Sequence, residues 1–279
     1  MSRVTPIAVL VALALAACSS EEPEIDSDGD GLTDSQEQEL GTDPQAVDSD
    51  GDLLDDADEI DLGTDPTDAD TDDDGYLDGW EVNEGKDPTD YLSRIYKGFW
   101  PYNPDKDSLP GGAWSTFDAD EGQILPRSAL LDQFGDTVDM FDFNDQGPYL
   151  AIDVSAMWCG PCKALAEWMT GGDDLYGFED YWSHVRMAVE DGRLQWITIM
   201  SEDRSGAVPD QDDLVDWYLD YEDPKTPILS DEDGHFQDLI RAYPSMFFFD
   251  PNFTLISAPG NTDSTHYQPM DAMEEFFSE

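Results

Sequence analysis

Two cysteines three residues apart are the clearest chemical signal in the sequence. Cys159 and Cys162 stand in the segment Trp158-Cys159-Gly160-Pro161-Cys162, between a predicted buried strand at 149–154 and a predicted helix that continues from Cys162 to Met169. This strand-to-helix junction is the context expected of a redox CxxC motif. A sulfur at a helix N-terminus meets unpaired N–H groups and the positive end of the dipole, so we expect a lowered pKa for the Cys159 thiol. Cys159 would then attack first, and Cys162 would resolve the mixed disulfide.

A zinc site at these two thiols is poorly supported. Structural zinc needs about four ligands, and the only other cysteine is Cys18. The three histidines, His184, His235 and His266, do not have the spacing of metal ligands. Redox chemistry is therefore favoured, and an inert disulfide is the remaining alternative.

The same half of the chain alternates predicted strands with predicted helices. The turn Phe134-Gly135-Asp136 lies between two strands of a hairpin, and later apolar runs indicate further strands. The predicted strands are 129–132, 137–143, 194–200, 246–249 and 253–257, and the predicted helices are 212–221 and 269–277. This alternation indicates an α/β domain.

Residues 123–279 resemble the thioredoxin superfamily through these elements and the five-residue CxxC segment. The leading hairpin and the long crossover before Pro227-Ile228-Leu229 are similar to the TlpA-like and AhpC/TSA-related envelope branch. The resemblance implies an α/β thioredoxin-like fold with a central mixed sheet flanked by helices. It also implies a thiol:disulfide oxidoreductase that exchanges disulfides with protein substrates, works with an upstream redox partner and uses no organic cofactor.

The resemblance further assigns a proton acceptor. Asp153 lies six residues before Cys159 in an otherwise apolar strand and matches the family's buried carboxylate. Because burial raises the pKa of a carboxyl group, Asp153 is expected to accept the proton of Cys162. An Asp at the sheet edge without a role is the alternative.

Three more residues are expected beside the pair. Tyr243-Pro244 matches the family's cis-proline loop, where backbone groups pair with a substrate strand, and Tyr243 is expected to narrow that groove. Trp158 is expected to shield the sulfurs, with simple packing as the alternative. Lys163 is expected to be a solvated helix charge rather than a stabiliser of the thiolate.

From Asp26 to Asp90 the sequence is crowded with acidic residues at a period of 22 residues. Asp26, Asp48 and Asp70 open the three units, and Gly41-Thr42-Asp43-Pro44 recurs in similar form 22 and 44 residues later. A charge run of this kind is usually disordered. Internal repetition instead predicts three similar structural units.

Each unit carries oxygen ligands at the positions of a calcium loop. Calcium takes about six to eight hard oxygen ligands, including a backbone carbonyl at position 7. Leu53 stands where Gly31 and Gly75 make the sharp turn, so the second loop is expected to be the weakest. The predicted ligands are Asp26, Asp28, Asp30, Leu32, Asp34 and Glu37, then Asp48, Asp50, Asp52, Leu54, Asp56 and Glu59, and finally Asp70, Asp72, Asp74, Tyr76, Asp78 and Glu81.

The short spacing of the units favours a linear array over EF-hand pairs. Only ten residues separate Glu37 from Asp48, too few for two flanking helices at about 1.5 Å per residue. The array resembles bacterial thrombospondin type 3 repeats, in which calcium ions replace a hydrophobic core. The resemblance implies structural Ca²⁺ and folding coupled to binding. A solvated acidic spacer is the alternative.

The N-terminus indicates export. Arg3 precedes an apolar core at 4–17 that is too short to span a membrane permanently. Leu15-Ala16-Ala17-Cys18 resembles the lipobox of bacterial lipoproteins, which implies cleavage before Cys18 and its acylation. Ser19 then implies the outer membrane of the cell envelope, on its periplasmic or surface face. A plain signal peptide is the alternative. With Cys18 lipidated in an oxidising compartment, Cys159 and Cys162 remain as the single disulfide pair.

These signals predict five segments. They are a signal peptide at 1–17, a lipid-anchor linker at 18–25, three calcium-binding repeats at 26–90, a connector at 91–122 and a thioredoxin-like domain at 123–279. The connector shows no sustained helical or strand period. Phe99, Trp100 and Trp114 are expected to pack it.

The composition limits the possible functions. A formal net charge of −54 repels nucleic-acid phosphates, so nucleic-acid binding is excluded. A thiol peroxidase would need Thr/Ser-x-x-Cys, and Ser155 has the wrong spacing. A copper-delivery protein would need a histidine placed with the thiols. A calcium-dependent surface-binding module with a vestigial redox centre is the third alternative, and insulin reduction would discriminate it.

Overall fold

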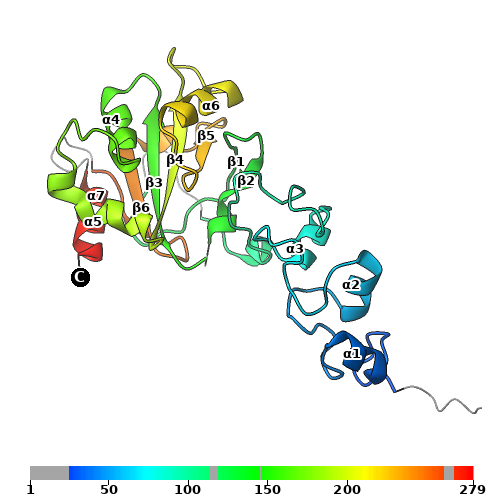
Figure 1. The fold of residues 1–279 in the computed structure, drawn as a ribbon. Coiled ribbons are helices and arrows are strands. Elements are labelled where there is room, and N and C mark those ends of the chain that lie inside the picture. The colour runs from blue at the N-terminus through cyan, green and yellow to red at the C-terminus, as the bar shows by residue number, and fades with distance from the viewer. Residues whose placement is uncertain (1–24, 113–118, 145, 261–266, 279) are drawn as a thin grey trace, which may run out of the picture. The chain divides into compact units, whose positions relative to one another are not determined.

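The computed structural model describes residues 25–112, 119–144, 146–260 and 267–278, which form two compact units (Figure 1). The first unit contains the described residues up to Thr71 and also Leu77–Gly79, and the second contains Asp72–Tyr76 and the described residues from Trp80 onward. Among these residues, no helix is both long enough and apolar enough to cross a membrane. The predicted signal peptide, Cys18, Trp114 and His266 lie outside the described residues.

Each acidic repeat forms a loop followed by one short helix. The helices are α1 (Asp34–Leu40), α2 (Asp56–Leu62) and α3 (Asp78–Asn83), the last of which is divided between the two units. Gly41 and Gly63 end the first two with φ of 97° and 92°, and their N–H groups donate to the carbonyls of Glu37 and Glu59. The left-handed conformation at these positions favours glycine, so the recurrent Gly-Thr-Asp-Pro segment marks the helix ends.

The second unit is built on a five-stranded sheet in the order β5-β4-β3-β6-β7. Its strands are β3 (Tyr149–Ala156), β4 (Leu194–Glu202), β5 (Ile228–Ser230), β6 (Ser245–Phe249) and β7 (Leu255–Ser257). The central strand β3 runs parallel to β4 and antiparallel to β6. The helices of this unit are α4 (Gly160–Met169), α5 (Glu179–Glu190), α6 (Gln211–Asp220) and α7 (Gln268–Phe277). The sheet is therefore mixed, as predicted.

Alternate side chains of β3 belong to two hydrophobic clusters, one on each face of the sheet. Leu150, Ile152 and Val154 belong to one cluster, together with residues of the antiparallel hairpin β1 (Ala129–Leu131) and β2 (Thr137–Asp139). Ala151 belongs to the other, with residues of α4, α5 and α7. Because successive side chains of a strand point to opposite faces, β3 is buried on both sides.

Two sequence predictions were wrong in detail. The second hairpin strand was predicted to reach Phe143, but Met140–Phe143 form a 3₁₀-helix, because the Asp139 carboxylate accepts the Phe141 N–H and turns the chain. No helix was predicted at α5, whose helical pattern is interrupted at Trp182 by non-helical backbone angles. Two further 3₁₀ turns are Lys106–Ser108 and Gln237–Leu239.

Of the two predicted connector aromatics that the structure describes, Trp100 is the buried one. Trp100 is buried and donates its indole N–H to the buried Asp132 carboxylate at 2.7 Å, whereas Phe99 is half-exposed. The CxxC segment lies where β3 passes into α4, beside the parallel partner β4. With the strand order above, this arrangement is the thioredoxin-like fold that the sequence predicted.

Candidate functional site

The two cysteines stand at the start of α4. Cys159 is the N-cap residue, and its Sγ accepts the backbone N–H of Cys162 at 3.1 Å. The two sulfurs are joined as a disulfide, with Cα atoms 5.3 Å apart. Pro161 lies in the first turn, where its missing N–H leaves no helix carbonyl without a donor. An N-cap sulfur that accepts an N–H is the position in which a thiolate is stabilised.

Burial does not separate the two sulfurs in this disulfide form. Cys159 is 2% exposed and Cys162 is fully buried, in a cluster that includes Met200 and Trp217. The two sulfurs differ in helix position, because Cys159 is the N-cap residue of α4 and Cys162 lies inside its first turn. A Cβ added at Gly160 would meet no atom within 4 Å, so the side of the pair that Gly160 presents is open.

Pro244 lies at the same end of the sheet as the pair. The Tyr243–Pro244 peptide bond is cis, and Ser245, which follows it, is paired in register with Val154 of β3. Pro244 itself is buried. Since β3 leads directly to Cys159, the antiparallel pairing with β6 brings the proline loop to the redox pair.

The contacts among Trp158, Tyr243 and Glu202, which together form an aromatic wall beside the pair, were not predicted from the sequence. The Trp158 ring is 51% exposed and meets the Tyr243 ring edge-on, with centroids 5.5 Å apart. Its indole N–H donates to Glu202 Oε2 at 2.6 Å, and Gln237 donates to Glu202 Oε1 at 2.8 Å. The Tyr243 hydroxyl lies 2.7 Å from Ser201 Oγ. Residue spacing could not reveal this wall, because its members come from four separate segments.

Asp153 is the buried titratable group of this region. It is 3% exposed, Ser155 Oγ donates to its Oδ2 at 2.9 Å, and its Oδ1 has no hydrogen-bond partner. Burial raises the pKa of Asp153 to about 7, against the lowering effect of the Ser155 hydrogen bond. A carboxyl group with this pKa can exchange a proton near neutral pH.

Among the described residues, the sequence also singled out the basic side chains of Lys163, His184 and His235. The Lys163 side chain is exposed on α4, and His235 is exposed. The His184 ring lies 2.5 Å from the Glu274 carboxylate of α7, which also accepts the backbone N–H of His184. These contacts connect α5 to α7.

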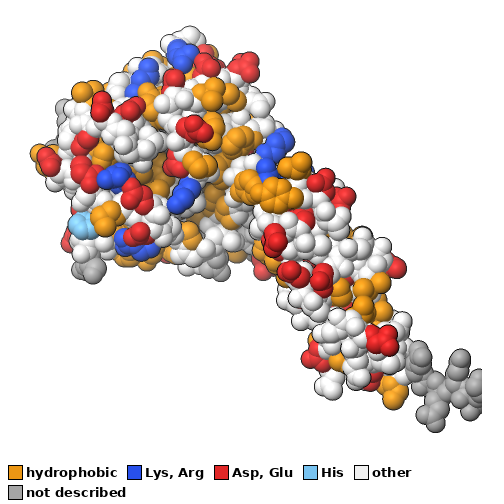
Figure 2. Space-filling view, viewed as in Figure 1, with side chains coloured by type: hydrophobic (Ala, Val, Ile, Leu, Met, Phe, Trp, Pro, Cys, Tyr) orange, Lys and Arg blue, Asp and Glu red, His pale blue; other side chains and the backbone are white. Residues whose placement is uncertain are grey.

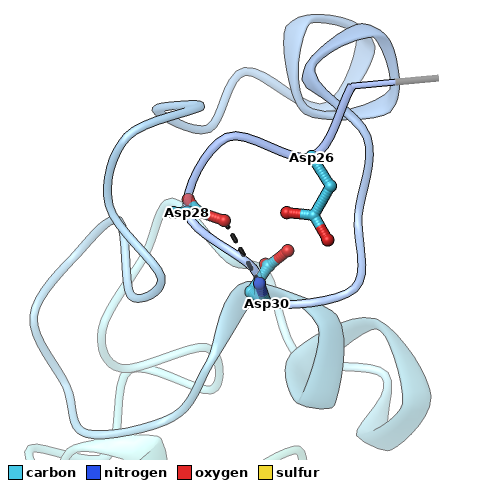
Figure 3. Close-up of side chains that lie close together, drawn as sticks. All are labelled: Asp26, Asp28 and Asp30. Carbon is cyan, nitrogen blue, oxygen red and sulfur yellow. Dashed lines mark hydrogen bonds between the residues drawn. The ribbon is translucent and has the colours of Figure 1, made fainter. Parts of the chain in front are cut away.

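The first acidic loop gathers its carboxylates without hydrogen-bond donors for all of them. Asp26, Asp28 and Asp30 each offer an oxygen within 4.8 Å of the others, and Figure 3 shows them converging inside the loop. Backbone N–H groups of Gly29, Asp30 and Leu32 donate to Asp26, Asp28 and Asp30 respectively. Glu37 is fully buried, and neither of its oxygens has a hydrogen-bond partner.

The second loop repeats this arrangement. Asp48, Asp50 and Asp52 lie within the same 4.8 Å limit, and both oxygens of Asp50 lack hydrogen-bond partners. Burial, followed by the charge of Asp52, raises the pKa of Asp50 to about 6. Leu53 has a φ of 85° where Gly31 and Gly75 have 111° and 97°. The loop therefore closes with a leucine in the left-handed conformation, which costs about 1 kcal/mol.

The chain divides into its two units within the sequence of the third loop. Asp70 and Asp78 belong to the first, and Asp72, Asp74, Tyr76 and Glu81 to the second. Asp74 N–H donates to Asp72 and Tyr76 N–H donates to Asp74, as in the loops before. The Tyr76 hydroxyl donates to the carbonyls of Tyr96 and Trp100, which joins this loop to the connector.

The residue at position 9 of each loop contacts the residue at position 2. Asp34 accepts from Ser27, Asp56 from the N–H and hydroxyl of Ser49, and Asp78 from the N–H of Thr71.

This donor set fits calcium. Hard carboxylate oxygens converge, several are buried without donors, and burial of uncompensated carboxylates is costly unless a cation neutralises them. The predicted carbonyl positions Leu32 and Leu54 follow the converging aspartates in each loop.

Comparison with known proteins supports the repeats directly. The family model described as bacterial TSP3 repeat matches residues 26–45, 48–69 and 70–90. The chain thus carries three bacterial TSP3 repeats ahead of a thioredoxin-like domain. No curated protein matches the chain.

Several solved structures are similar to part of the chain. One is the thioredoxin domain of a thiol-disulfide oxidoreductase from Bacteroides vulgatus, at 18% identity and a TM-score of 0.37, covering 57% of this chain and 99% of that one. Another is the exposed lipoprotein thioredoxin of Streptococcus pneumoniae, at 23% identity and 0.35, covering 52% and 98%. A thiol:disulfide interchange protein from Bacteroides sp. matches at 15% identity and 0.39, covering 62% and 93%. The fold assignment rests on the strand order and the position of the cysteines.

Proposed function

We propose that this chain is an exported thiol:disulfide oxidoreductase that exchanges disulfides with protein substrates through Cys159 and Cys162. The observation that carries the proposal is the N-cap position of Cys159, whose sulfur accepts the Cys162 N–H at the start of α4. The exposed Trp158, next to Cys159 in the chain, and the Pro244 loop, which the pairing of β3 with β6 brings to the same end of the sheet, support a substrate groove there.

The proposed reaction is a two-step exchange. In the reducing direction, the Cys159 thiolate attacks a substrate disulfide, forms a mixed disulfide and releases one substrate thiolate. The Cys162 thiolate then attacks Cys159 Sγ, which closes the Cys159–Cys162 disulfide and releases the second substrate thiolate. A dithiol reductant restores the two thiols. The reduction potential sets the net direction, and equilibration with glutathione measures it.

Asp153 is proposed to take the proton of Cys162 during the second step. Its burial and its pKa of about 7 suit a base that works near neutral pH. Asp153→Asn should slow resolution of the mixed disulfide while leaving the pKa of Cys159 within about one unit. An unchanged resolution rate in stopped-flow measurements would reduce Asp153 to a packing residue.

The division of labour between the sulfurs gives the decisive experiment. Cys162→Ser should accumulate mixed disulfides with substrate, because the attacking sulfur remains and the resolving sulfur is gone. Cys159→Ser should trap none in the reducing direction and should not reduce insulin. In the reduced protein, iodoacetamide should label Cys159 first. Preferential labelling of Cys162 would reverse the roles of the two sulfurs. If both variants still reduced insulin like the wild type, the redox proposal would be wrong.

The repeats are proposed to bind structural calcium in each loop. The family match and the buried carboxylates without donors support this role. We expect affinities of about 10⁻⁴ to 10⁻³ M for single loops, as in extracellular modules. Titration calorimetry that detects no calcium binding would exclude it.

We also propose that Cys18 carries a lipid anchor and that the protein lies at the outer membrane of the cell envelope. The motif before Cys18 supports the anchor, and the segment boundaries 1–17, 18–25, 26–90, 91–122 and 123–279 follow from it and from the repeats. Cys18→Ala should release the protein from membranes in detergent-free fractionation without altering its thiol chemistry. A variant that stays with the membrane would contradict the anchor.

A further inference from the structure

Glu202 holds a carboxylate beside the redox pair. It is the last residue of β4, in register with Ala156 of β3, and its carbonyl accepts the N–H of Met157 at 2.9 Å. These contacts fix the Glu202 backbone against the segment that leads to Cys159. Its carboxylate lies at the edge of the Trp158 ring, because the indole N–H donates to Oε2 at 2.6 Å. A negative charge is thus held next to the residue that precedes the attacking sulfur.

The hydrogen bonds of this carboxylate hold it in place without neutralising it. Its two donors, the Trp158 indole and the Gln237 amide, are both neutral. Gln237 is itself fixed, since its backbone N–H donates to the buried Asp231 carboxylate at 2.7 Å. Among the described residues, no lysine, arginine or histidine pairs with Glu202, and Arg204, two positions along, pairs with α6 instead. The Glu202 side chain is partly exposed, so its charge is available to a ligand.

The Trp158 ring adds a surface on which a cation can bind. The side chain is half-exposed, although it is large and apolar. The Tyr243 ring meets it edge-on, and the Tyr243 hydroxyl lies 2.7 Å from Ser201 Oγ, so the two rings support each other. A cation is attracted to the face of a tryptophan ring, and a carboxylate bonded to the indole N–H polarises that ring in the favourable direction. An arginine guanidinium can stack on such a ring and also donate to a carboxylate at its edge.

The charge of the whole chain favours the same kind of ligand. The formal net charge is −54, and Figure 2 shows more acidic than basic side chains on the face that it draws. Such a field attracts cationic partners and speeds their encounter with the protein. Long-range attraction does not distinguish one position on a substrate from another. A carboxylate and an aromatic ring beside Cys159 do distinguish them, because both act over short distances.

We propose that Glu202 and Trp158 form a subsite for a basic side chain, preferably arginine, next to the reacting cysteine of a protein substrate. The inference rests on the proposed disulfide exchange at Cys159 and Cys162 and specifies its substrate class. When the Cys159 sulfur attacks the substrate disulfide, an arginine beside the substrate cysteine lies over the Trp158 ring and pairs with Glu202. A substrate cysteine beside an acidic residue meets repulsion at the same place.

The reaction of the reduced full chain with three peptide disulfides tests this subsite. Each substrate is the symmetrical disulfide dimer of a short peptide with a single cysteine. An arginine adjoins the cysteine in the first peptide, the same arginine stands at the far end of the second, and a glutamate adjoins the cysteine in the third. In each reaction the two protein thiols become the Cys159–Cys162 disulfide, and the peptide disulfide becomes two peptide thiols. Stopped-flow tryptophan fluorescence measures the second-order rate constant.

A reference reaction removes the effect of the arginine on the peptide's own chemistry. A neighbouring charge changes the pKa of the peptide thiol and therefore its rate of leaving, so each rate constant is divided by that for reduction by dithiothreitol. After this division, we expect the first peptide to react about threefold to tenfold faster than the second, and the third to react slowest. The first two peptides have the same net charge, so long-range attraction cancels between them. The preference should shrink as salt is added, because the pair is partly exposed.

Glu202→Gln tests the carboxylate, and Glu275→Gln is its matched control. Glu275 is exposed on α7, and its substitution makes the same change in charge. Glu202→Gln should reduce the preference for the first peptide over the second to less than about twofold, because only the aromatic ring remains. The readout is a ratio of two peptides on one variant, so a change in the reactivity of the thiols cancels. Glu275→Gln should keep the wild-type ratio.

The outcomes separate the subsite from the reaction that it serves. Equal normalised rates for the first and second peptides would overturn the subsite while leaving the disulfide exchange intact. A preference that persists in Glu202→Gln would also overturn it, because another group would then bind the arginine. An equal fall in Glu275→Gln would attribute the preference to net charge and overturn the subsite as well. A wild-type chain that reduces none of the peptides would remove the proposed exchange and the subsite together.

Discussion

Both compact units bury carboxylates, but they compensate them differently. In the second unit, the fully buried Asp142 accepts hydrogen bonds from the Tyr96 hydroxyl at 2.5 Å and the Asn103 N–H at 2.9 Å, and it pairs with Lys106 at 2.9 Å. In the first unit, Glu37 is equally buried and neither of its oxygens has a hydrogen-bond partner. The second unit supplies donors and a lysine to Asp142, whereas neither oxygen of Glu37 has a donor, so we expect the first unit to need a cation.

The hydrophobic residues follow the same division. Among the described residues, the three clusters of buried apolar side chains contain only residues of the second unit. Leu53, Ile60 and Leu62 of the first unit are exposed. Apolar burial is the usual source of folding free energy. A unit without such a cluster must gain its stability elsewhere, and ion binding is the source that its carboxylates offer.

Removal of calcium should therefore produce the largest difference between the units. In EDTA, we expect residues 25–71 to lose hydrogen-exchange protection, because the repulsion of their carboxylates is no longer cancelled. The strands β3, β4 and β6 should keep theirs. Exchange measured by mass spectrometry, with excess calcium as the control, gives both results at once. Equal protection of the repeats with and without calcium would break the comparison.

In the second unit, the pH dependence of stability should come largely from the buried carboxyl group of Asp153. The pKa of Asp153 is about 7 when folded and near 3.9 when unfolded, so the folded state holds a proton between these values that the unfolded state releases. Stability should therefore fall as pH rises from about 4 to 7, by up to about 4 kcal/mol. Asp153→Asn should remove this fall in urea unfolding at saturating calcium. An unchanged pH slope would show that Asp153 does not titrate in this range.

Breaking the compensation of Asp142 should make the second unit resemble the first. Lys106→Met leaves the buried carboxylate without its cation and should destabilise the unit by about 3 kcal/mol. Lys97→Met is the matched control, because the Lys97 side chain is 62% exposed beside Asp136 and its pair should contribute less than about 1 kcal/mol. Urea unfolding followed by tryptophan fluorescence measures both. Equal losses in the two variants would contradict the distinction.

Leu53 gives the smallest and most local test. Leu53→Gly relieves the left-handed conformation of the second loop, and we expect a gain of about 1 kcal/mol in the calcium-bound stability of the repeats. Leu40→Gly, at an exposed helical position, should instead destabilise by about 1 kcal/mol. Thermal melts in calcium show whether Leu53→Gly raises the melting temperature and Leu40→Gly lowers it.

Features that depend on short spacing along the chain could be predicted before the fold was known. The 22-residue period located the three loops, because calcium ligands lie within twelve consecutive residues. The junction of strand and helix located Cys159 and Cys162. Asp153 was recognisable as an isolated acid in an apolar run, and the alternation of that run predicted a buried strand, which the structure extends to Ala156.

Contacts between residues far apart in the chain became known only from the folded structure. Glu202 accepts a hydrogen bond from the indole N–H of Trp158, which is 44 residues away in the chain, and Lys106 lies 36 residues from its partner Asp142. No local period records these pairs. Asp78 shows the distinction within one residue: its spacing predicts a ligand for the third loop, and only the folded chain shows that its carboxylate also lies within 4.8 Å of those of Glu59 and Asp52. Spacing along the chain fixes which residues share a loop, but the packing of one backbone segment on another determines which buried charges must be neutralised together.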